Sequence, residues 1–490
     1  MIGVLTTEDF RVILSNLGKV VGIVSPVFLV PLIAVYYYGE LEYIWDFVLP
    51  FLLALVLAAA LMFLFRTEQE MRIRHAVALT AISYLVFSFL GAIPILKVSP
   101  TFLDALFESV SGWSTTGLST IAANADTFPH SINLWRHLMQ YIGGLGIVVM
   151  SLVVLSRAGT GVESTVFYTA EGRTERIGAS IVSTVRSLLS IYVVFFVFGA
   201  IALNLFGMTW FDAICHSMAG FSTGGFSTHA ESIGFFRSNS LELITLIIMV
   251  MGATNFALYY VLIRGRINEL WKNLEIRIFA ILLGALALPT ILWLNKEAYP
   301  ASEGFRLGFY QITSALTTTG WMTEPSGKMA TLWAPFALGL TALAMSIGAS
   351  TGSTGGGIKR MRFGLLLKSI RWKVQETLSP EAAVIVKKFH HIEDRILEDN
   401  TMNDIFIMVS AYGVLLVLST LITAAYGYSL GDSFFEASSA LGTIGMSSGI
   451  TGLGMPGALK VVFMIDMWAG RLEVLPVLVF LASLKGLIMR

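Results

Sequence analysis

Long apolar runs alternate along the chain with two kinds of polar connection. A membrane-spanning helix requires roughly 20 mostly apolar residues. Ten segments come close to that requirement: 20–38, 47–65, 76–96, 138–156, 187–206, 243–263, 278–295, 329–347, 405–428 and 461–484. Some connections are short and basic, whereas others are longer and rich in Gly, Ser and Thr. The pattern predicts an all-α polytopic membrane protein with ten transmembrane helices.

The basic residues predict an orientation, because cytoplasmic loops of membrane proteins carry an excess of Lys and Arg. With the N-terminus inside, 24 of the 32 Lys and Arg residues fall inside, seven fall outside, and Arg471 lies within a span. We therefore expect a multi-pass protein of the cell (inner or plasma) membrane with both termini cytoplasmic.

Composition agrees with this class. The 490 residues are 55% hydrophobic and only 13% charged, whereas soluble domains carry about 25% charged residues. The formal net charge of zero gives no reason to expect nucleic acid as a partner. The single cysteine, Cys215, excludes an internal disulfide framework and a cysteine-based zinc site. Acidic residues precede the first apolar run, so we expect no cleaved signal peptide there.

Four polar segments in the predicted outer connections share one pattern. They read ESVSGWSTTGLST, HSMAGFSTGGFST, QITSALTTTGWMT and EASSALGTIGMSS, and they align on Gly117, Gly225, Gly320 and Gly445. Each has Thr two residues before the glycine, a small pair five and six before, and a polar residue nine before. Thirteen residues before the glycine, the first, second and fourth copies have Asp, whereas the third copy has Leu307. Four copies in register indicate an internal repeat.

The repeated segment has the chemistry of an ion filter. Eight to ten residues from the Asp to the small pair predict a short half-helix, with Asp104, Asp212 and Asp432 as N-caps. The C-terminal end of such a helix carries partial negative charge, which favours a cation. We expect the following Thr and Gly residues to run extended, with backbone carbonyls replacing an ion's hydration shell. The alternative is that Gly, Ser and Thr form ordinary outer turns.

The candidate filter has four quarters, which the alignment defines. They are Ser114, Thr115, Thr116 and Gly117; Ser222, Thr223, Gly224 and Gly225; Thr317, Thr318, Thr319 and Gly320; and Gly442, Thr443, Ile444 and Gly445. Within them, we expect the ion to contact Thr115, Thr116, Thr223, Gly224, Thr318, Thr319, Thr443 and Ile444. The second and fourth quarters differ in sequence from the other two.

The repeat predicts the organisation of the whole chain. Eight helices form four parallel helix–pore-loop–helix repeats around one pseudo-fourfold pore, preceded by two leading helices. The predicted units are 1–70 (the leading helices), 71–160, 161–270, 271–375 and 376–490.

The chain resembles the TrkH/KtrB/HKT superfamily of potassium transport subunits, and most closely its TrkH branch. Besides the filters, QYIGGLGIVVM (140–150), MGATNFALYY (251–260), GSTGGGIKRMR (352–362) and MWAGRLEVLPVL (467–478) are similar to family signatures. The resemblance implies K⁺ as the transported ion, no prosthetic group, a homodimer within membrane lipid, and a cytosolic ring of TrkA-type nucleotide-binding regulatory subunits. Glycine at Gly117 matches members that conduct K⁺.

A glycine-rich stretch interrupts the second span of the third repeat. Gly348, Gly352, Gly355, Gly356 and Gly357 lie within ten residues, too many for a stable helix interior. The resemblance implies an intramembrane gating loop over 348–357; a static helix break is the alternative. The P-loop motif requires G-K-[ST], and Ile358 separates Gly357 from Lys359, so we reject nucleotide binding here.

Arg471 is an ionisable residue within a predicted span, where such residues are rare. We expect it to face the pore below the filter as an electrostatic barrier to cations. The alternative is a structural pair with Glu473, Asp466 or backbone carbonyls. Lys359 and Arg360 are either ordinary anchors at the inner mouth or part of the gate. The pair His390–His391 is expected on a solvated face.

Three functions compete. The first is a gated, channel-like K⁺ uptake pore, and the second is a symporter that couples K⁺ to H⁺ or Na⁺. Coupling calls for a buried carboxylate, for which Asp466 is the nearest candidate. A membrane enzyme is rejected, because the sequence has no HExxH motif and no paired catalytic carboxylates at a useful spacing. The regulatory partner is expected on 157–186 and 359–395, the longest inside connections.

Overall fold

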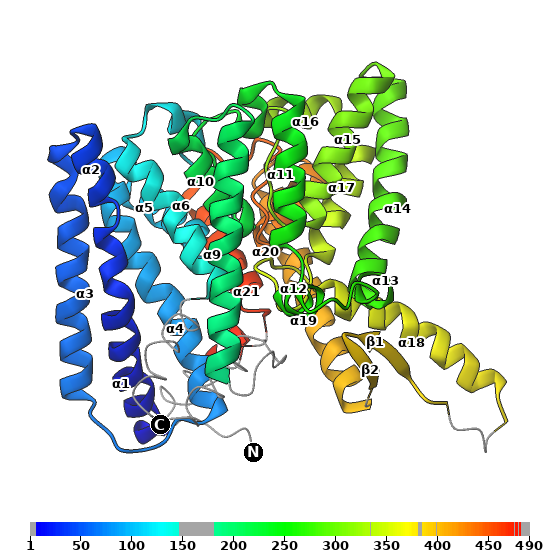
Figure 1. Ribbon diagram of the computed structural model, residues 1–490, viewed down its shortest axis with the longest axis horizontal. Helices are drawn as coiled ribbons and strands as arrows, with labels where there is room; N and C mark the ends of the chain where they lie inside the picture. The colour runs from blue at the N-terminus through cyan, green and yellow to red at the C-terminus, as the bar shows by residue number, and fades with distance from the viewer. Residues whose placement is uncertain are drawn as a thin grey trace.

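The computed structural model describes residues 6–146, 181–333, 335–380, 385–397, 399–474, 476–478 and 480–481. Nearly all regular structure in these ranges is helical, and most helices run side by side (Figure 1). The predicted partner-binding connection 157–186 lies largely outside the described residues.

The helices are described in five successive groups, and two helices, Glu269–Lys272 and Arg360–Leu378, cross the predicted unit boundaries at residues 270 and 375. The leading group is α1 (Thr7–Val24), α2 (Leu32–Tyr38) and α3 (Ile44–Leu64). It is followed by α4 (Ile73–Ala92), α5 (Phe102–Trp113) and α6 (His130–Leu145), and by α9 (Ile181–Leu205), α10 (Trp210–Phe221), α11 (Asn239–Gly252), α12 (Phe256–Ile263) and α13 (Glu269–Lys272). The last groups are α14 (Leu274–Glu297), α15 (Ala301–Leu316), α16 (Ser326–Leu332), α17 (Phe336–Ile347) and α18 (Arg360–Leu378), then α19 (Asp399–Ala425), α20 (Leu430–Leu441) and α21 (Gly457–Arg471).

Short 3₁₀ helices and one hairpin complete the described structure. The 3₁₀ helices are Ser25–Leu29, Leu41–Tyr43, Ile93–Val98, Ala122–Thr127 and Ser232–Phe236. Strands β1 (Lys388–His391) and β2 (Glu393–Ile396) form an antiparallel pair that aligns Lys388 with Ile396.

Membrane-length helices are present, as the hydrophobic pattern predicts. In the described ranges, six helices are long and apolar enough to cross a membrane, or seven if the bent pair α11 and α12 is one span. Their outer faces keep large apolar side chains exposed, among them Phe63, Leu205 and Leu288, which suits contact with lipid. The chain is therefore a multi-pass membrane protein. The full set of ten spans stays a prediction, since 138–156 and 461–484 extend beyond the described residues. The apolar helix within the predicted span 329–347, Phe336–Ile347, is shorter than a full span.

Two predicted spans are wrong in detail. The first begins at Thr7 rather than at residue 20, because Thr6 and Asp9 form a capping box that starts the helix among polar residues. The predicted span 243–263 is not one straight helix, because α11 and α12 meet at a bend of 97°. Asn255 produces the break by capping the new helix through the Ala257 N–H at 2.7 Å.

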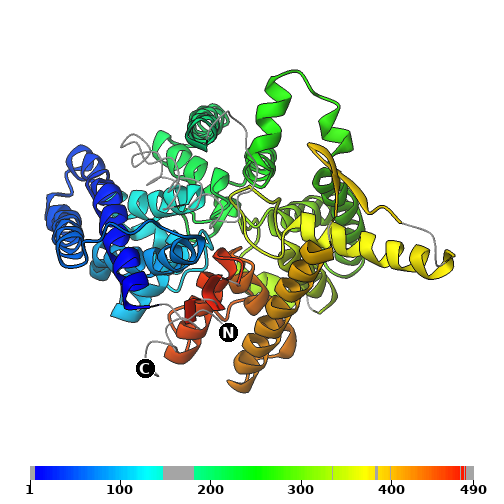
Figure 2. The ribbon, with the colours of Figure 1, turned by 90° about the horizontal axis from the view of Figure 1, so that it is seen from below.

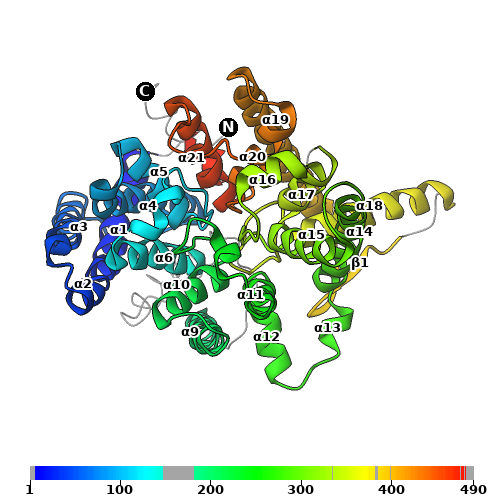
Figure 3. The same ribbon diagram turned by 90° about the horizontal axis from the view of Figure 1, so that it is seen from above.

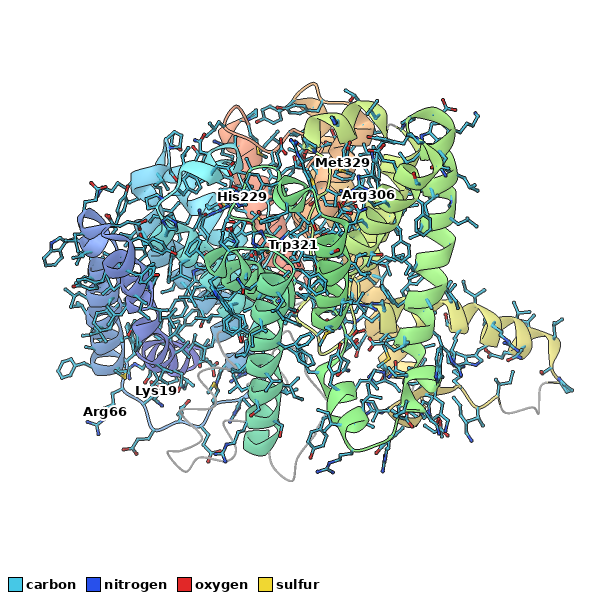
Figure 4. All side chains as sticks on the ribbon, turned by 45° about the horizontal axis from the view of Figure 1, so that its top comes forward. Lys19, Arg66, His229, Arg306, Trp321 and Met329 are labelled. Atoms are coloured by element: carbon cyan, nitrogen blue, oxygen red, sulfur yellow. The ribbon has the colours of Figure 1, made fainter. Side chains whose placement is uncertain are left out.

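The short helices α5, α10, α15 and α20 are linked in a closed order. Each packs on a helix of the preceding group: α10 on α6, α15 on α11, α20 on α17, and α5 on α21. Viewed from above and from below, these groups succeed one another around the centre of the molecule (Figures 2 and 3). Lys19 and Arg66, predicted inside, lie toward the end opposite Arg306 and Met329 (Figure 4).

Candidate ion-binding site

The four short helices end in the same backbone geometry. In each, the invariant threonine follows the helix in the left-handed region: Thr115, Thr223, Thr318 and Thr443 have φ of 56°, 50°, 56° and 52°. The next residue donates its N–H back to the first residue of the small pair, at 2.9 Å for Thr116 to Ser111 and 2.7 Å for Gly224 to Ala219. Such bonds define a Schellman motif, which ends a helix sharply.

This geometry corrects two expectations. The threonine two residues before each glycine is not extended but left-handed. A β-branched residue in that conformation costs about 1–3 kcal/mol, so the surrounding contacts must impose the conformation. Asp104, Asp212 and Asp432 are not the N-caps. The caps are the hydroxyls of Thr101, Thr209 and Ser429, and each Asp sits three residues later, where its N–H donates to the hydroxyl. In the third copy the helix starts earlier, at Ala301, and Leu307 lies in its interior.

The four aligned glycines bring the segments into one ring. A Cβ on Gly117 would lie 2.2 Å from the Gly224 carbonyl oxygen, and one on Gly225 would lie 1.9 Å from that of Thr319. A Cβ on Gly320 would lie 1.7 Å from the Ile444 oxygen, and one on Gly445 would lie 2.4 Å from the Thr116 oxygen. Each glycine also has positive φ, between 77° and 100°. Only glycine meets both requirements, so the ring explains the glycine in every copy.

Hydroxyls line the same segments. Ser114 Oγ lies 2.7 Å from Thr116 Oγ1, and Thr317 Oγ1 lies 3.1 Å from Thr319 Oγ1. Ser222 Oγ donates to the Ala219 carbonyl at 3.1 Å. In the fourth quarter, Gly442 is the C-cap of α20. The contacts between glycines and carbonyls thus bring all four predicted quarters together.

The polar residue nine positions before each glycine holds the chain that leaves the ring. Glu108, His216, Gln311 and Glu436 are all fully buried. Glu108 binds Arg136 at 2.7 Å, and Arg136 donates to the Ser227 carbonyl at 3.1 Å. Glu436 accepts from the Ser448 N–H at 2.9 Å and the Thr451 hydroxyl at 2.7 Å. These side chains position the ring rather than line it, a role that the pattern of polar residues did not reveal.

The glycine-rich stretch passes directly against the ring. Residues 348–359 are non-helical between α17 and α18. Thr354 Oγ1 lies 3.2 Å from Thr223 Oγ1. A Cβ on Gly355 would lie 2.2 Å from Thr318 Oγ1, and one on Gly356 would lie 2.2 Å from Thr443 Oγ1. The predicted helix break is confirmed, and the loop contacts three of the four quarters.

Arg471 covers the remaining quarter. Its Nη1 lies 3.2 Å from Thr115 Oγ1 and also donates to the Thr354 carbonyl of the loop. Nη2 donates to the carbonyls of Gly143 and Gly144 at 2.7 and 3.0 Å. Arg471 thus lies where the loop, the ring and the end of α6 meet. Its neighbour Glu473 is bound by Arg362 and lies 3.9 Å from Lys359.

Buried cations fix the loop on its inner side. Lys359 donates to the Gly355 carbonyl, and Arg360 donates to the Ala253 carbonyl at 2.8 Å. Both residues are buried, so neither is an ordinary exposed anchor. Ser350 N–H also reaches the Ala253 carbonyl at 3.1 Å. The break between α11 and α12 therefore supplies the acceptor that holds the loop.

A second connection runs from the loop to the hairpin. Thr351 N–H donates to Glu275 at 2.7 Å, and Glu275 lies 3.8 Å from His391 of β1. His391 is fully buried, so the expected solvated face is wrong for this residue. His390 remains partly exposed, and hydrogen bonds to Glu269 and Asp394 raise its pKa above the ordinary value.

The ring suits a cation held by backbone oxygens. In the part of the chain that the structure describes, no group of three His, Cys, Asp or Glu residues could hold a metal ion. Carbonyls and hydroxyls at four helix C-termini instead offer partial negative charge without a fixed charge. Together with the multi-pass fold, this arrangement defines a class: a membrane protein that transports ions.

The comparisons with known proteins agree with this class. The chain belongs to the TrkH family of cation transport proteins, whose model matches residues 45–486. This family consists of ion transport proteins and not of enzymes, as the sequence predicts.

Relatives extend over nearly the whole chain. An uncharacterized cation transporter of Methanocaldococcus jannaschii is 33% identical over 98% of this chain and 97% of its own. The Trk system potassium uptake protein TrkH of Escherichia coli is 31% identical, over 96% of this chain and 98% of its own. The crystal structure of the potassium transporter TrkH from Vibrio parahaemolyticus matches with a TM-score of 0.82 at 28% identity, covering 96% and 98% of the two chains.

Proposed function

We propose that this protein takes up K⁺ across the cell membrane through a channel-like pore. Ten spans, eight of them in four parallel repeats, surround the pore, and the four quarters form its selectivity filter. The observation that carries the proposal is the closed ring, in which each glycine abuts the carbonyl of the next quarter. Backbone oxygens arranged in this way replace the hydration shell of K⁺.

The loop 348–357 and Arg471 form the gate of the proposed pore. Thr354, Gly355, Gly356 and Arg471 each face one threonine hydroxyl of the ring, so in this conformation they obstruct the path beneath the filter. A guanidinium at this place also repels an approaching cation, and that repulsion is strong where water is excluded. Opening requires the loop and Arg471 to leave their present partners.

Regulation reaches the gate from the cytoplasmic face. We place a TrkA-type nucleotide-binding ring against 157–186 and 359–395, on a homodimer. The connection from His391 through Glu275 to Thr351 offers a route by which movement of the hairpin changes the loop. Loss of copurification after charge-neutralising substitutions in 359–395 is the expected result, and unchanged copurification contradicts this placement.

Flux in reconstituted vesicles tests the proposal. Purified protein should carry K⁺ and Rb⁺ faster than Na⁺ and Li⁺, without an imposed pH gradient. Equal flux of all four cations would refute the filter, and absence of flux even with Arg471→Ala would refute the pore.

One observation favours coupled transport as a second candidate. Asp466 of α21 is buried, and Ser419 donates to its Oδ1 at 2.8 Å, whereas Oδ2 has no hydrogen-bond partner among the described residues. A buried carboxylate that exchanges a proton is what a symporter requires. If K⁺ uptake follows an imposed pH gradient and Asp466→Asn abolishes that dependence, the coupled mechanism replaces the simple pore.

A further inference from the structure

The second quarter of the ring differs from the others because another helix occupies its side-chain space. Gly224 stands where the other quarters have Thr116, Thr319 and Ile444. A Cβ on Gly224 would lie 2.4 Å from Cδ and 2.6 Å from Oε1 of Gln140. Gln140 belongs to α6, so a residue 84 positions away excludes any larger side chain at position 224.

The Gln140 amide binds both sides of this quarter. Its Nε2 donates to the Gly224 carbonyl at 2.5 Å, and its Oε1 accepts from the Phe226 N–H at 3.1 Å. The side chain is fully buried. In the first and third quarters the corresponding threonine bonds a hydroxyl of its own segment instead. The amide therefore takes the place of the missing side chain.

We infer that Gln140 is a specificity-determining residue of the proposed filter. The inference rests on the proposed function, because it concerns one of the four ring carbonyls. A carbonyl oxygen that accepts a strong N–H bond has a weaker field for a cation. Field strength of the coordinating oxygens is one basis for K⁺ over Na⁺ discrimination, and a weaker field favours the larger, more easily dehydrated ion. Gln140 thus fixes the position of the Gly224 carbonyl and weakens its field.

Selectivity measurements on two variants test this role. Gln140→Met removes donor and acceptor at similar volume, whereas Gln140→Glu keeps an acceptor for Phe226 but loses the donor to Gly224. Both should raise the ratio of Na⁺ to K⁺ flux about tenfold, which corresponds to roughly 1.4 kcal/mol. Tyr141→Phe, on the same helix but bonded to Tyr192, should leave the ratio unchanged. An unchanged ratio in both Gln140 variants, or equal loss of all fluxes, overturns the inference.

A double substitution covers the case in which the single variants fail to fold. Gly224→Thr alone should abolish flux, since Thr collides with Gln140. Adding Gln140→Ala makes room for the threonine and should restore flux, with the raised Na⁺ to K⁺ ratio expected of the single Gln140 variants; failure to restore any flux, or a wild-type ratio in the double variant, contradicts the inference. If wild-type protein itself does not distinguish K⁺ from Na⁺, the proposed filter fails, and that outcome is distinct from an unaltered ratio in the variants.

An independent site lies where α14 meets α18. A cavity of about 300 Å³ has apolar walls from Leu274, Ile278, Ile281 and Leu367. Four cations line it as well: Lys272, Arg277, Lys368 and Arg371. None of the four makes an ion pair within the described ranges of the chain, and Arg277 Nε donates only to a backbone carbonyl. Lys272 lies near the carboxylate of Asp394, whereas Lys368 is exposed to the like charges of Arg277 and Arg371. A negative ligand would reduce the repulsion among these three residues.

We propose that this cavity binds the headgroup of an anionic phospholipid. Basic pockets between membrane helices bind such headgroups, at about 1 kcal/mol per Lys or Arg near the surface. Ile281, Leu288 and Leu292 are 60–63% exposed along α14, and acyl chains can lie against them. Figure 1 shows α14 rising at the outer side of the molecule from the level where α18 projects. α18 begins directly after the loop, so a lipid bound here would stabilise the loop in its present position.

Native mass spectrometry of the full protein tests the lipid site. With phosphatidylglycerol and phosphatidylcholine supplied equally, wild type should retain phosphatidylglycerol. The triple variant Arg277→Gln/Lys368→Gln/Arg371→Gln should retain at least about tenfold less, given the charge contributions above. The control Arg264→Gln/Arg266→Gln/Lys373→Gln removes the same charge from other exposed positions and should behave as wild type. Equal loss of phosphatidylglycerol in the triple variant and the control overturns the site. Displacement of the lipid by inorganic phosphate overturns it too, and so does a changed oligomeric state without loss of lipid.

Discussion

The ring and the layer beneath it are built in opposite ways. The ring uses one backbone motif four times, with a left-handed threonine and a glycine in each copy. The layer beneath uses single copies: Thr354, Gly355, Gly356 and Arg471 each face one quarter. A repeated backbone gives equivalent oxygens and little freedom, whereas a glycine-rich loop and one side chain can move. In the proposed function, selection therefore belongs to the repeated part and gating to the unique part.

Substitution in the ring should have the largest effect. Gly320→Ala places a Cβ 1.7 Å from the Ile444 carbonyl oxygen at a φ of 82°, so the ring cannot close. We expect K⁺ flux to fall by more than about a hundredfold, as for misplacement of groups at a site by 1 Å. Gly339→Ala, in α17 where a Cβ meets nothing within 4 Å, is the control in the same vesicle assay. Normal flux in Gly320→Ala would contradict the ring.

Removal of the charge beneath the ring should have the next largest effect, in the opposite direction. Arg471→Ala removes the guanidinium and its bonds to the loop and to Thr115, so cation flux without a regulatory partner should rise about tenfold or more. Glu473→Gln is the control, because it removes a neighbouring charge of the opposite sign and should not raise flux. Reduced or unchanged flux in well-folded Arg471→Ala would show that Arg471 is structural.

The loop itself should give a smaller increase. Thr354→Val removes hydroxyl bonds to the carbonyls of Phe221 and Gly252, both 3.0 Å. At roughly 1 kcal/mol for net loss of such bonds, the open fraction should rise about fivefold. Single-channel recording in planar bilayers would measure that fraction. Thr331→Val is the control, because it makes the same change at a threonine whose hydroxyl is exposed. No change in open fraction would mean that the loop is static.

The hairpin should show the smallest effect, as a dependence on pH. Hydrogen bonds from the His390 side chain to Glu269 and Asp394 raise the pKa of His390 above the ordinary value of 6.5. Stabilisation of the docked hairpin is therefore complete below that value and is lost as pH rises through the higher, folded pKa. Hydrogen exchange of β1 amides, corrected for intrinsic pH dependence, should accelerate across this window, and Glu269→Gln should weaken the effect, because only the bond to Asp394 remains. Identical profiles for both proteins would contradict it.

The sequence predicted where the ring lies but not how it closes. Register among the four segments was visible because the glycines and threonines repeat at fixed offsets. The left-handed threonines were missed, because a β-branched residue rarely adopts φ > 0 and only the assembled contacts impose it. The caps were misassigned because Thr101 and Asp104 are both good capping residues, and position decides between them.

Contacts between distant segments could not be predicted. Gln140 reaches Gly224 from another helix, and His391 is buried only because the break at Asn255 and the start of α14 enclose it. The bend of 97° between α11 and α12 was missed although Thr254 and Asn255 interrupt the apolar run, because the apolar residues on both sides together have the length of one span. By contrast, Arg471 and the glycine-rich loop were both singled out by residues that suit a spanning helix poorly.

The position of the ion tests the central claim most directly. A crystal of the protein grown in Rb⁺ should show anomalous scattering inside the ring, close to the carbonyl oxygens of Thr116, Gly224, Thr319 and Ile444. The peak should weaken when K⁺ competes and should persist when Na⁺ does. Absence of a peak in the ring, with Rb⁺ bound instead beside Asp466, would contradict a filter made of four backbone segments.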